Sequence, residues 1–331
     1  MDPMHSLIRD FPDHLTHAVA IGRSAHLGKP DARYTNVVVT GLGGSGIGGR
    51  IAAQAVAEQA SCPMEVYSNY YLPAYVGHGS LVIACSYSGD TEETLAAMQQ
   101  ALDRGARVAC ITSGGKMLAM AKEKGLDHIV IPGGNPPRTM LAYSLTQQFV
   151  LLKHYGIIET DALVGLERCA AQLKQDQAAI DKSGRELAEK LHGKRAIIYC
   201  EASTEAVAIR FRQQLNENSK ELCWHHAIPE MNHNELVGWA GGDAGMSIVI
   251  FRHVDDHPRS QMRMEINKEV FARYTPHIHE VWSQGEDRLE RQLYLVHLGD
   301  WASWHLAALK GVDATEIGVI NMLKGKLAQV K

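Results

Sequence analysis

Short apolar runs alternate with longer segments of mixed composition along most of this 331-residue chain. A run that is apolar without interruption, such as residues 81–85, is typical of a strand buried on both faces of a parallel sheet. The runs predicted as strands are residues 37–39, 64–67, 81–85, 107–112, 128–131, 195–200, 247–251 and 293–297.

The segments between these runs have the composition of helices. Residues 161–191 predict one or two surface helices, with an interruption near Gly184. Strands that alternate with helices through short connections predict an α/β fold with two doubly wound parallel sheets. We expect an N-terminal domain over residues 1–153, a helical connector over 154–192 and a C-terminal domain over 193–331. The other predicted helices are residues 14–27, 49–60, 92–104, 117–124, 140–155 and 205–215.

The composition excludes some classes of function. Hydrophobic residues make up 45% of the chain, charged residues make up 21%, and the formal net charge is -4. This balance gives no electrostatic reason to expect nucleic acid or a membrane surface as partner. No apolar run approaches the ~20 residues of a membrane span, and the N-terminus lacks the apolar stretch of a signal peptide. The six cysteines include no Cys-x-x-Cys pair, so we expect a cytoplasmic protein without disulfides or a structural metal.

A glycine-rich segment, Gly41 to Gly49, follows the first predicted strand and precedes a helix. This arrangement offers backbone N–H groups to an anion, and the glycines let the backbone approach it closely. Gly41-x-Gly43-x-x-Gly46 also fits a dinucleotide fingerprint, which requires an acidic residue about 20 residues further on. Residues 67–71 (Tyr-Ser-Asn-Tyr-Tyr) supply no carboxylate there. A tight turn that only packs helix against sheet remains a third possibility.

Three hydroxyl side chains, Ser86, Ser88 and Thr91, lie between the strand at 81–85 and the helix at 92–104. They are suited to capping the helix. They are also suited to hold a phosphate monoester beside the free N–H groups of the helix start. In a parallel sheet this loop and the glycine segment open on the same carboxyl edge, where ligands bind. Two such loops suit a small phosphorylated ligand better than a dinucleotide.

The two loops, Gly-Gly-Ser-Gly-Ile-Gly-Gly and Ser-Tyr-Ser-Gly-Asp-Thr, resemble those of sugar isomerase (SIS) domains. Three later segments resemble the bifunctional phosphoglucose/phosphomannose isomerases: Asn-Pro-Pro-Arg138, Gln-Leu-Asn-Glu217-Asn-Ser-Lys and Glu-Met-Asn-His233-Asn-Glu-Leu-Val-Gly. The motifs occur in the order found in the family, and the resemblance extends over nearly the whole chain. The resemblance implies two flavodoxin-like SIS domains.

The resemblance also implies which residues bind the substrate. Gly44 and Ser45 match residues that contact the sugar. Ser86, Ser88 and Thr91 match the pocket for its phosphate.

Four further positions match catalytic residues of the family, and a fifth matches a specificity position. Glu217 matches the base that moves a proton between C1 and C2, and Arg138 matches the arginine beside those carbons. His233 matches the ring-opening histidine, which the family implies comes from the neighbouring subunit. Lys310 resembles the lysine near the ring oxygen. Ser303 is small where single-function relatives have glutamine, which implies room for either face of the enediol to be protonated.

We therefore expect an isomerase that interconverts glucose 6-phosphate and mannose 6-phosphate with fructose 6-phosphate as a homodimer. The active site is expected to be completed across the subunit interface. Proton transfer through a cis-enediol needs a carboxylate and electrostatic support, so no cofactor or metal is expected. The pair His277 and His279, followed by Glu280, lacks a convincing further set of metal ligands. The alternatives are a non-catalytic SIS module that senses a sugar phosphate, an isomerase of another phosphosugar, and a nucleotide-dependent oxidoreductase.

Overall fold

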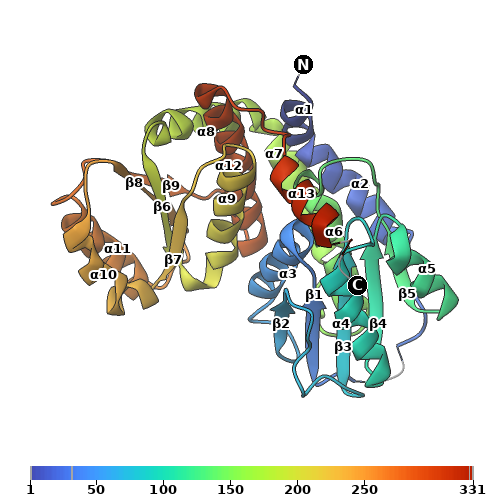
Figure 1. Ribbon diagram of the computed structural model, residues 1–331. Helices are drawn as coiled ribbons and strands as arrows, with labels where there is room; N and C mark the ends of the chain where they lie inside the picture. Colours follow the sequence, from blue (N-terminus) through green and yellow to red (C-terminus); the bar gives the residue numbers. More distant parts are fainter. Residues whose placement is uncertain (1, 31–32, 328, 330–331) are drawn as a thin grey trace. The chain divides into compact units, whose positions relative to one another are not determined.

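The computed structural model describes residues 2–30, 33–327 and 329 (Figure 1). Contacts within the chain divide it into two units. The N-terminal unit comprises Arg9–Gln177 and Gln284–Tyr294, and the C-terminal unit comprises Met1–Ile8, Ala178–Ser283 and Leu295–Lys331. The domain boundaries expected from the sequence remain a prediction.

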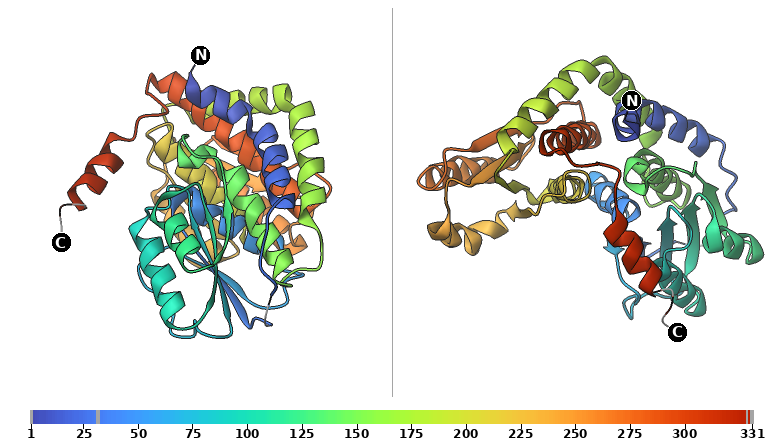
Figure 2. Two further views of the ribbon diagram at one scale, coloured as in Figure 1. Left: turned by 90° about the vertical axis from the view of Figure 1, so that its right-hand side faces the viewer. Right: turned by 45° about the horizontal axis from the view of Figure 1, so that its top comes forward.

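The N-terminal unit is built on a five-stranded parallel sheet with the strand order β2-β1-β3-β4-β5. This is the order of flavodoxin-like folds. Apolar residues on one face of the sheet pack against α4 and α5 (Figures 1 and 2). Helices α3 and α6 contact each other, and they also contact strands β2 and β4, respectively. The elements are α2 (Phe11–Arg23), β1 (Asn36–Thr40), α3 (Gly43–Ala55), β2 (Met64–Tyr67), β3 (Ser80–Ser86), α4 (Glu92–Asp103), β4 (Arg107–Thr112), α5 (Gly115–Glu123), β5 (Asp127–Val130), η1 (Pro137–Thr139), α6 (Leu141–His154) and α7 (Ala162–Gln175).

The C-terminal unit contains a four-stranded parallel sheet with the strand order β7-β6-β8-β9. Renumbered within the unit, this order repeats the first four positions of the other sheet. The prediction of two parallel α/β sheets is therefore confirmed. The elements are α1 (Pro3–Arg9), α8 (Gln177–Leu191), β6 (Arg195–Glu201), η2 (Ala202–Thr204), α9 (Glu205–Glu217), β7 (Trp224–Ile228), η3 (Glu230–His233), α10 (Glu235–Gly238), η4 (Trp239–Gly241), β8 (Met246–Arg252), α11 (Pro258–Phe271), β9 (Ile278–Trp282), most of α12 (Arg288–Lys310) and α13 (Gly318–Leu327). The first part of α12, residues 288–294, belongs to the N-terminal unit.

The strand predicted at residues 293–297 is wrong, because these residues lie inside the 23-residue helix α12. Leu293, Leu295 and His297 are fully buried there, so the run is apolar because the helix is in the core. A short apolar run does not by itself distinguish a strand from a buried helix. The fourth strand of this sheet is instead β9, whose half-exposed side chains gave only a weak signal.

The interruption that the sequence predicted near Gly184, within the helical connector, lies elsewhere in the structure. Helices α7 and α8 are separated at Asp176, and Gly184 lies within α8. A Cβ at Gly184 would come within 2.7 Å of the Trp301 Cβ, so the glycine permits close packing of α8 on α12.

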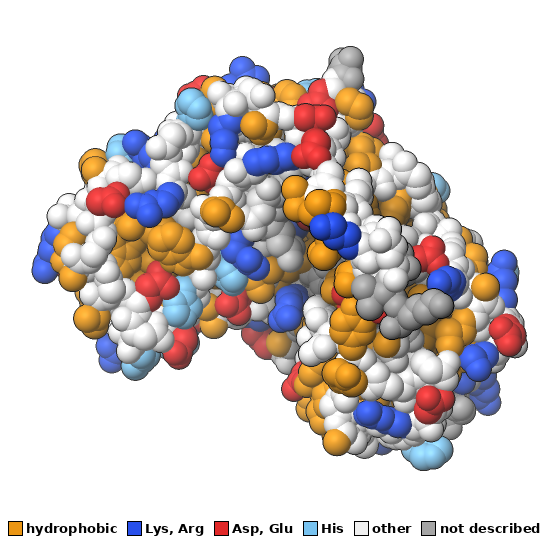
Figure 3. Space-filling view, in the orientation of Figure 1, with side chains coloured by type: hydrophobic (Ala, Val, Ile, Leu, Met, Phe, Trp, Pro, Cys, Tyr) orange, Lys and Arg blue, Asp and Glu red, His pale blue; other side chains and the backbone are white. Residues whose placement is uncertain are grey.

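The face of the molecule drawn in Figure 3 shows no large patch of one charge among the described residues. Lysine and arginine side chains are interspersed there with aspartates and glutamates. Among the described residues, no helix has both the length and the apolar character needed to cross a membrane.

Candidate active site

The glycine-rich segment is mostly helix and not a turn. Helix α3 begins at Gly43, whereas the sequence predicted its start near Gly49. A Cβ on Gly46 would lie 2.5 Å from the Gly41 carbonyl oxygen, and one on Gly49 would lie 2.9 Å from Val39 Cγ1. Glycine is therefore required because the helix packs directly on the strand that precedes it.

The hydroxyl loop joins the end of β3 to the start of α4. Ser86 is buried, and its Oγ lies 2.8 Å from Thr91 Oγ1 and accepts a hydrogen bond from the Gly89 N–H. Ser88 is exposed, and its Oγ accepts a hydrogen bond from the Asp90 N–H. Thr91 is the N-cap residue of α4, yet its side chain makes no capping hydrogen bond. The first N–H groups of α4 thus receive no cap from this hydroxyl, as an anion site requires.

The glycine segment and the hydroxyl loop meet at one edge of the sheet. Ser45 Oγ on α3 accepts a hydrogen bond from the Tyr87 N–H at 3.2 Å. The prediction that both loops lie at the same carboxyl edge is therefore confirmed. Beneath them, burial raises the pKa of the Cys85 thiol to about 12, so this cysteine is not a thiolate nucleophile at neutral pH.

Arg138 lies on η1, beside the same loops. Its side chain is only 3% exposed. A Cβ on Gly44 would stand 2.9 Å from the Pro137 oxygen and 3.6 Å from the Arg138 Cα. The loop also includes Asn135, whose N–H donates to Tyr87 Oη at 3.0 Å. The N-terminal unit thus collects all its predicted site residues: Gly44, Ser45, Ser86, Ser88, Thr91 and Arg138.

Glu217 is the last residue of α9 in the C-terminal unit, and it is partly buried. The next two residues, Asn218 and Ser219, are fully buried. Asn218 Nδ2 donates to Ser303 Oγ at 2.9 Å, and Ser219 Oγ donates to the Ser303 carbonyl oxygen at 2.6 Å. Ser303 is itself fully buried on α12. Its side chain therefore supports the turn after Glu217.

Lys310 lies beside the same turn. Its Nζ forms an ion pair with Glu221 and donates to the Lys220 carbonyl oxygen. Lys220, with φ +51°, donates from Nζ to the carbonyl oxygens of Glu217, Asp313 and Glu316. The sequence indicated Asn218 and Ser219 only as residues that favour a helix end beside Glu217, and it did not single out Lys220. Their place in the Asn-Glu-Asn-Ser-Lys motif was the available signal.

His233 lies on another segment of the C-terminal unit, at the end of η3, and is exposed. The structure therefore joins Glu217, Ser303 and Lys310 around one turn and carries His233 separately. Among the described residues, no group of three or more His, Cys, Asp or Glu side chains is placed to hold a metal ion. His279 lies on β9, and burial lowers its pKa to about 4.

The fold is shared with solved structures. The C-terminal domain of glucosamine-fructose-6-phosphate aminotransferase from Francisella tularensis superposes with a TM-score of 0.75. It covers 95% of this chain and 98% of its own, at 18% identity. The SIS domain model matches residues 32–155, and the model described as "Bacterial phospho-glucose isomerase C-terminal SIS domain" matches residues 180–327. The chain is thus a protein with two SIS domains.

Sequence relatives narrow this class further. A bifunctional phosphoglucose/phosphomannose isomerase from Caldicellulosiruptor bescii is 36% identical, covering 99% of this chain and 100% of the relative. A D-glucosamine-6-phosphate 4-epimerase from Sulfolobus acidocaldarius is 30% identical, covering 86% of each. The chain belongs to the family of bifunctional phosphoglucose/phosphomannose isomerases.

Proposed function

We propose that this protein interconverts glucose 6-phosphate and mannose 6-phosphate with fructose 6-phosphate. The observation that carries the proposal is Glu217, a partly buried carboxylate at the end of α9 in a chain of this family. One carboxylate that takes and returns a proton is the group that an aldose–ketose isomerisation needs.

In the proposed reaction, the substrate phosphate occupies the loop of Ser86, Ser88 and Thr91 at the start of α4. His233 gives a proton to the ring oxygen as the ring opens, and the C1 hydroxyl releases its proton to solvent as C1 becomes an aldehyde. Glu217 removes the proton from C2, which leaves an enediolate with its charge on the C1 oxygen. The C2 hydroxyl passes its proton to the C1 oxygen, and Glu217 delivers the proton that it took to C1 as the C2 oxygen becomes a carbonyl. The fixed positive charge of Arg138 stabilises the enediolate oxygen. The two hexose phosphates differ only in the face of C2 that is protonated in the reverse direction.

The rival functions differ from this proposal in what they require. A non-catalytic sensor needs the hydroxyl loop but has no use for Glu217, Arg138 and His233 together. A nucleotide-dependent oxidoreductase requires a carboxylate after β2. The residue there is Ser68, whose Oγ donates to the Gly41 carbonyl oxygen. The 4-epimerase among the relatives makes another phosphosugar a specific alternative.

The test is an assay of the purified protein in EDTA with each hexose phosphate. We expect fructose 6-phosphate to form from both glucose 6-phosphate and mannose 6-phosphate, at rates that EDTA leaves unchanged, because proton transfer through Glu217 needs no metal. Glucosamine 6-phosphate serves as the comparison substrate. Absence of turnover on both hexose phosphates, or turnover of the amino sugar alone, would refute the proposal.

We also propose that the enzyme is a cytoplasmic homodimer in which His233 completes the active site of the partner subunit. Its ligands are then small sugar phosphates, with no nucleic acid or membrane as partner. Support comes from the family and from the exposure of His233, which lies on a different segment from the turn around Glu217.

Mixing two inactive variants tests the shared site. If Glu217→Gln and His233→Ala subunits are dissociated and reassociated together, a mixed dimer has one site with both residues intact. Random pairing in a twofold dimer predicts recovery of about a quarter of wild-type activity. Each variant alone, treated in the same way, is the control. No recovery, despite mixed dimers seen by native mass spectrometry, would place His233 in the same subunit as Glu217.

A further inference from the structure

The segment from Pro229 to Gly242 carries His233 and has little regular structure of its own. It consists of the short helices η3, α10 and η4. Met231 and Trp239 are its buried apolar residues, whereas His233 and Val237 are exposed. Such a segment needs contacts with the rest of the unit to hold one conformation, because short helical turns are only marginally stable in isolation.

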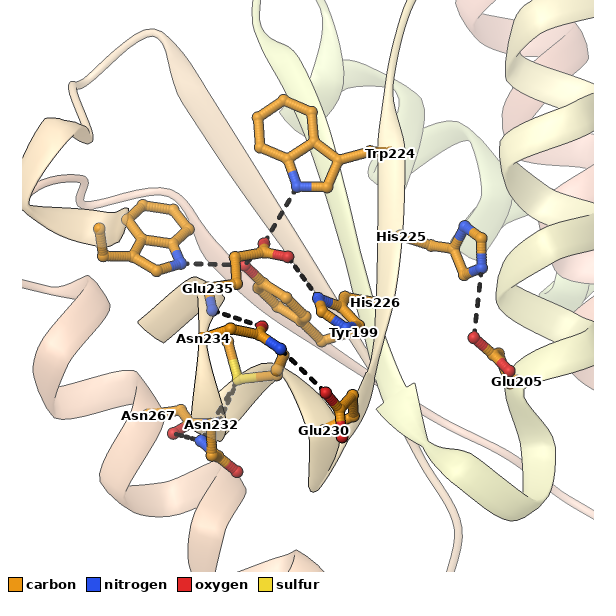
Figure 4. A network of polar contacts seen from close by, with 12 residues as sticks. Tyr199, Glu205, Trp224, His225, His226, Glu230, Asn232, Asn234, Glu235 and Asn267 are labelled. Carbon is orange, nitrogen blue, oxygen red and sulfur yellow. Dashed lines mark hydrogen bonds and ion pairs between the residues drawn. The ribbon is translucent and has the colours of Figure 1, made fainter. Parts of the chain in front are cut away.

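Glu235, two residues after His233, holds the segment in place through hydrogen bonds of its carboxylate (Figure 4). Its Oε1 accepts hydrogen bonds from Tyr199 Oη at 2.5 Å and from Trp224 Nε1 at 3.0 Å. Its Oε2 lies 2.6 Å from His226 Nδ1, and this nitrogen donates because a carboxylate only accepts. One carboxylate therefore ties the segment to both β6 and β7.

Tyr199 also binds Trp239, near the C-terminal end of the segment, and so adds this end to the same hydrogen-bond network. Its Oη accepts a hydrogen bond from Trp239 Nε1 at 2.9 Å while it donates to Glu235. Burial and the neighbouring Glu235 raise the pKa of Tyr199, so the hydroxyl keeps its proton and remains a donor. The Tyr199 ring stacks on Phe271 at 5.2 Å between centroids, which fixes the tyrosine in the core.

The residues on either side of His233 are also hydrogen-bonded. Asn232 Nδ2 donates to Asn267 Oδ1 on α11 at 2.7 Å. Asn234 Nδ2 donates to Glu230 Oε1 at 2.9 Å, and its Oδ1 accepts from the Glu235 N–H. His233 is thus exposed between two hydrogen-bonded neighbours, and Glu235, two residues after it, binds the strands of the sheet.

We propose that Glu235 is a positioning residue, which sets the location of His233 by holding its segment on Tyr199, Trp224 and His226. The inference rests on the proposed function, since it gives His233 the ring-opening step. Glu235 itself touches no substrate in this proposal. Its loss affects the step that His233 performs and leaves substrate binding and proton transfer at Glu217 intact.

Ring opening is measured separately from isomerisation by the interconversion of the α and β anomers of glucose 6-phosphate. This reaction opens and closes the ring without moving a proton between C1 and C2. Glu217→Gln is expected to keep catalysed anomer interconversion while isomerisation is lost. His233→Ala is expected to lose both.

Glu235→Ala is expected to lower catalysed anomer interconversion and isomerisation together, by about 10- to 100-fold, because displacement of a catalytic group by about 1 Å has this effect. Binding of an open-chain five-carbon aldonate phosphate, which resembles the enediolate, should be unchanged. Tyr199→Phe removes only the hydroxyl and should show the same pattern, with non-additive effects in the double variant. Glu235→Gln, which keeps the shape and one oxygen, should be intermediate.

Asp243→Asn is the matched control, because Asp243 is exposed and binds Arg195 and the Gly245 N–H instead of the residues around Glu235. It should behave as wild type. Normal anomer interconversion in Glu235→Ala and Tyr199→Phe would overturn the inference, as would a proportional loss of inhibitor binding. If Glu235→Ala does not fold, the same measurements on Tyr199→Phe and Glu235→Gln test the positioning role of Glu235. A wild-type protein without isomerase activity would instead overturn the proposed function.

Discussion

Glu217→Gln is expected to lower the isomerisation of both hexose phosphates by about 10²- to 10⁴-fold, the usual contribution of a general base. Glutamine keeps the shape and hydrogen-bonding reach of the side chain but cannot take a proton from C2. Because the same carboxylate returns the proton to C1, both directions of the reaction should fall by the same factor. The measurement is coupled turnover from either sugar, together with solvent deuterium incorporation at C2, which should fall in parallel.

The structure explains why this variant should fold normally. Glu217 is the last residue of α9, and the buried neighbours Asn218 and Ser219 carry the hydrogen bonds that hold the turn. Glu189→Gln on α8, exposed in the same unit, is the matched control and should retain wild-type turnover and melting temperature. Full turnover by Glu217→Gln would remove Glu217 from the reaction and leave the isomerase without an assigned base.

The sequence predicted the elements whose patterns are strong by themselves. Strands β2 and β4 match the predicted bounds, because each is a compact β-type run between clear turn signals. Edge strand β7 was missed, since its residues His225 and His226 are polar and only partly buried. Its place in the sheet comes from pairing with β6, which a local pattern does not contain.

The candidate residues of the site come from the sequence, whereas the residues that support them do not. Motif order makes Glu217 and His233 candidates, but the partners that hold their segments are distant in sequence. Asn218 meets Ser303, which is 85 residues away, and Glu235 meets Tyr199, which is 36 residues away. Such contacts follow from the packing of whole elements, so they become visible only in the folded structure.

Ser303→Gln separates the two roles that sequence and structure suggest for this position. The resemblance to the family implies that a glutamine would crowd the substrate and reduce mannose 6-phosphate turnover selectively. In the structure, Ser303 is fully buried, donates to the Asp300 carbonyl oxygen and accepts from Asn218. A longer side chain there has no room, and overpacking of a core position costs about 1–3 kcal/mol.

We therefore expect Ser303→Gln to lower the melting temperature and to reduce turnover of glucose 6-phosphate and mannose 6-phosphate by similar factors, because the turn after Glu217 is displaced. Ser303→Ala is the matched variant: it adds no volume but removes the hydroxyl that accepts a hydrogen bond from the buried Asn218 amide, and one such bond contributes about 0.5–1.5 kcal/mol. It too should lower both rates and leave their ratio unchanged. A selective loss of mannose 6-phosphate turnover in Ser303→Gln, at unchanged melting temperature, would contradict the supporting role. That result would show instead that the side chain at this position faces the substrate and controls which face of the enediol is protonated.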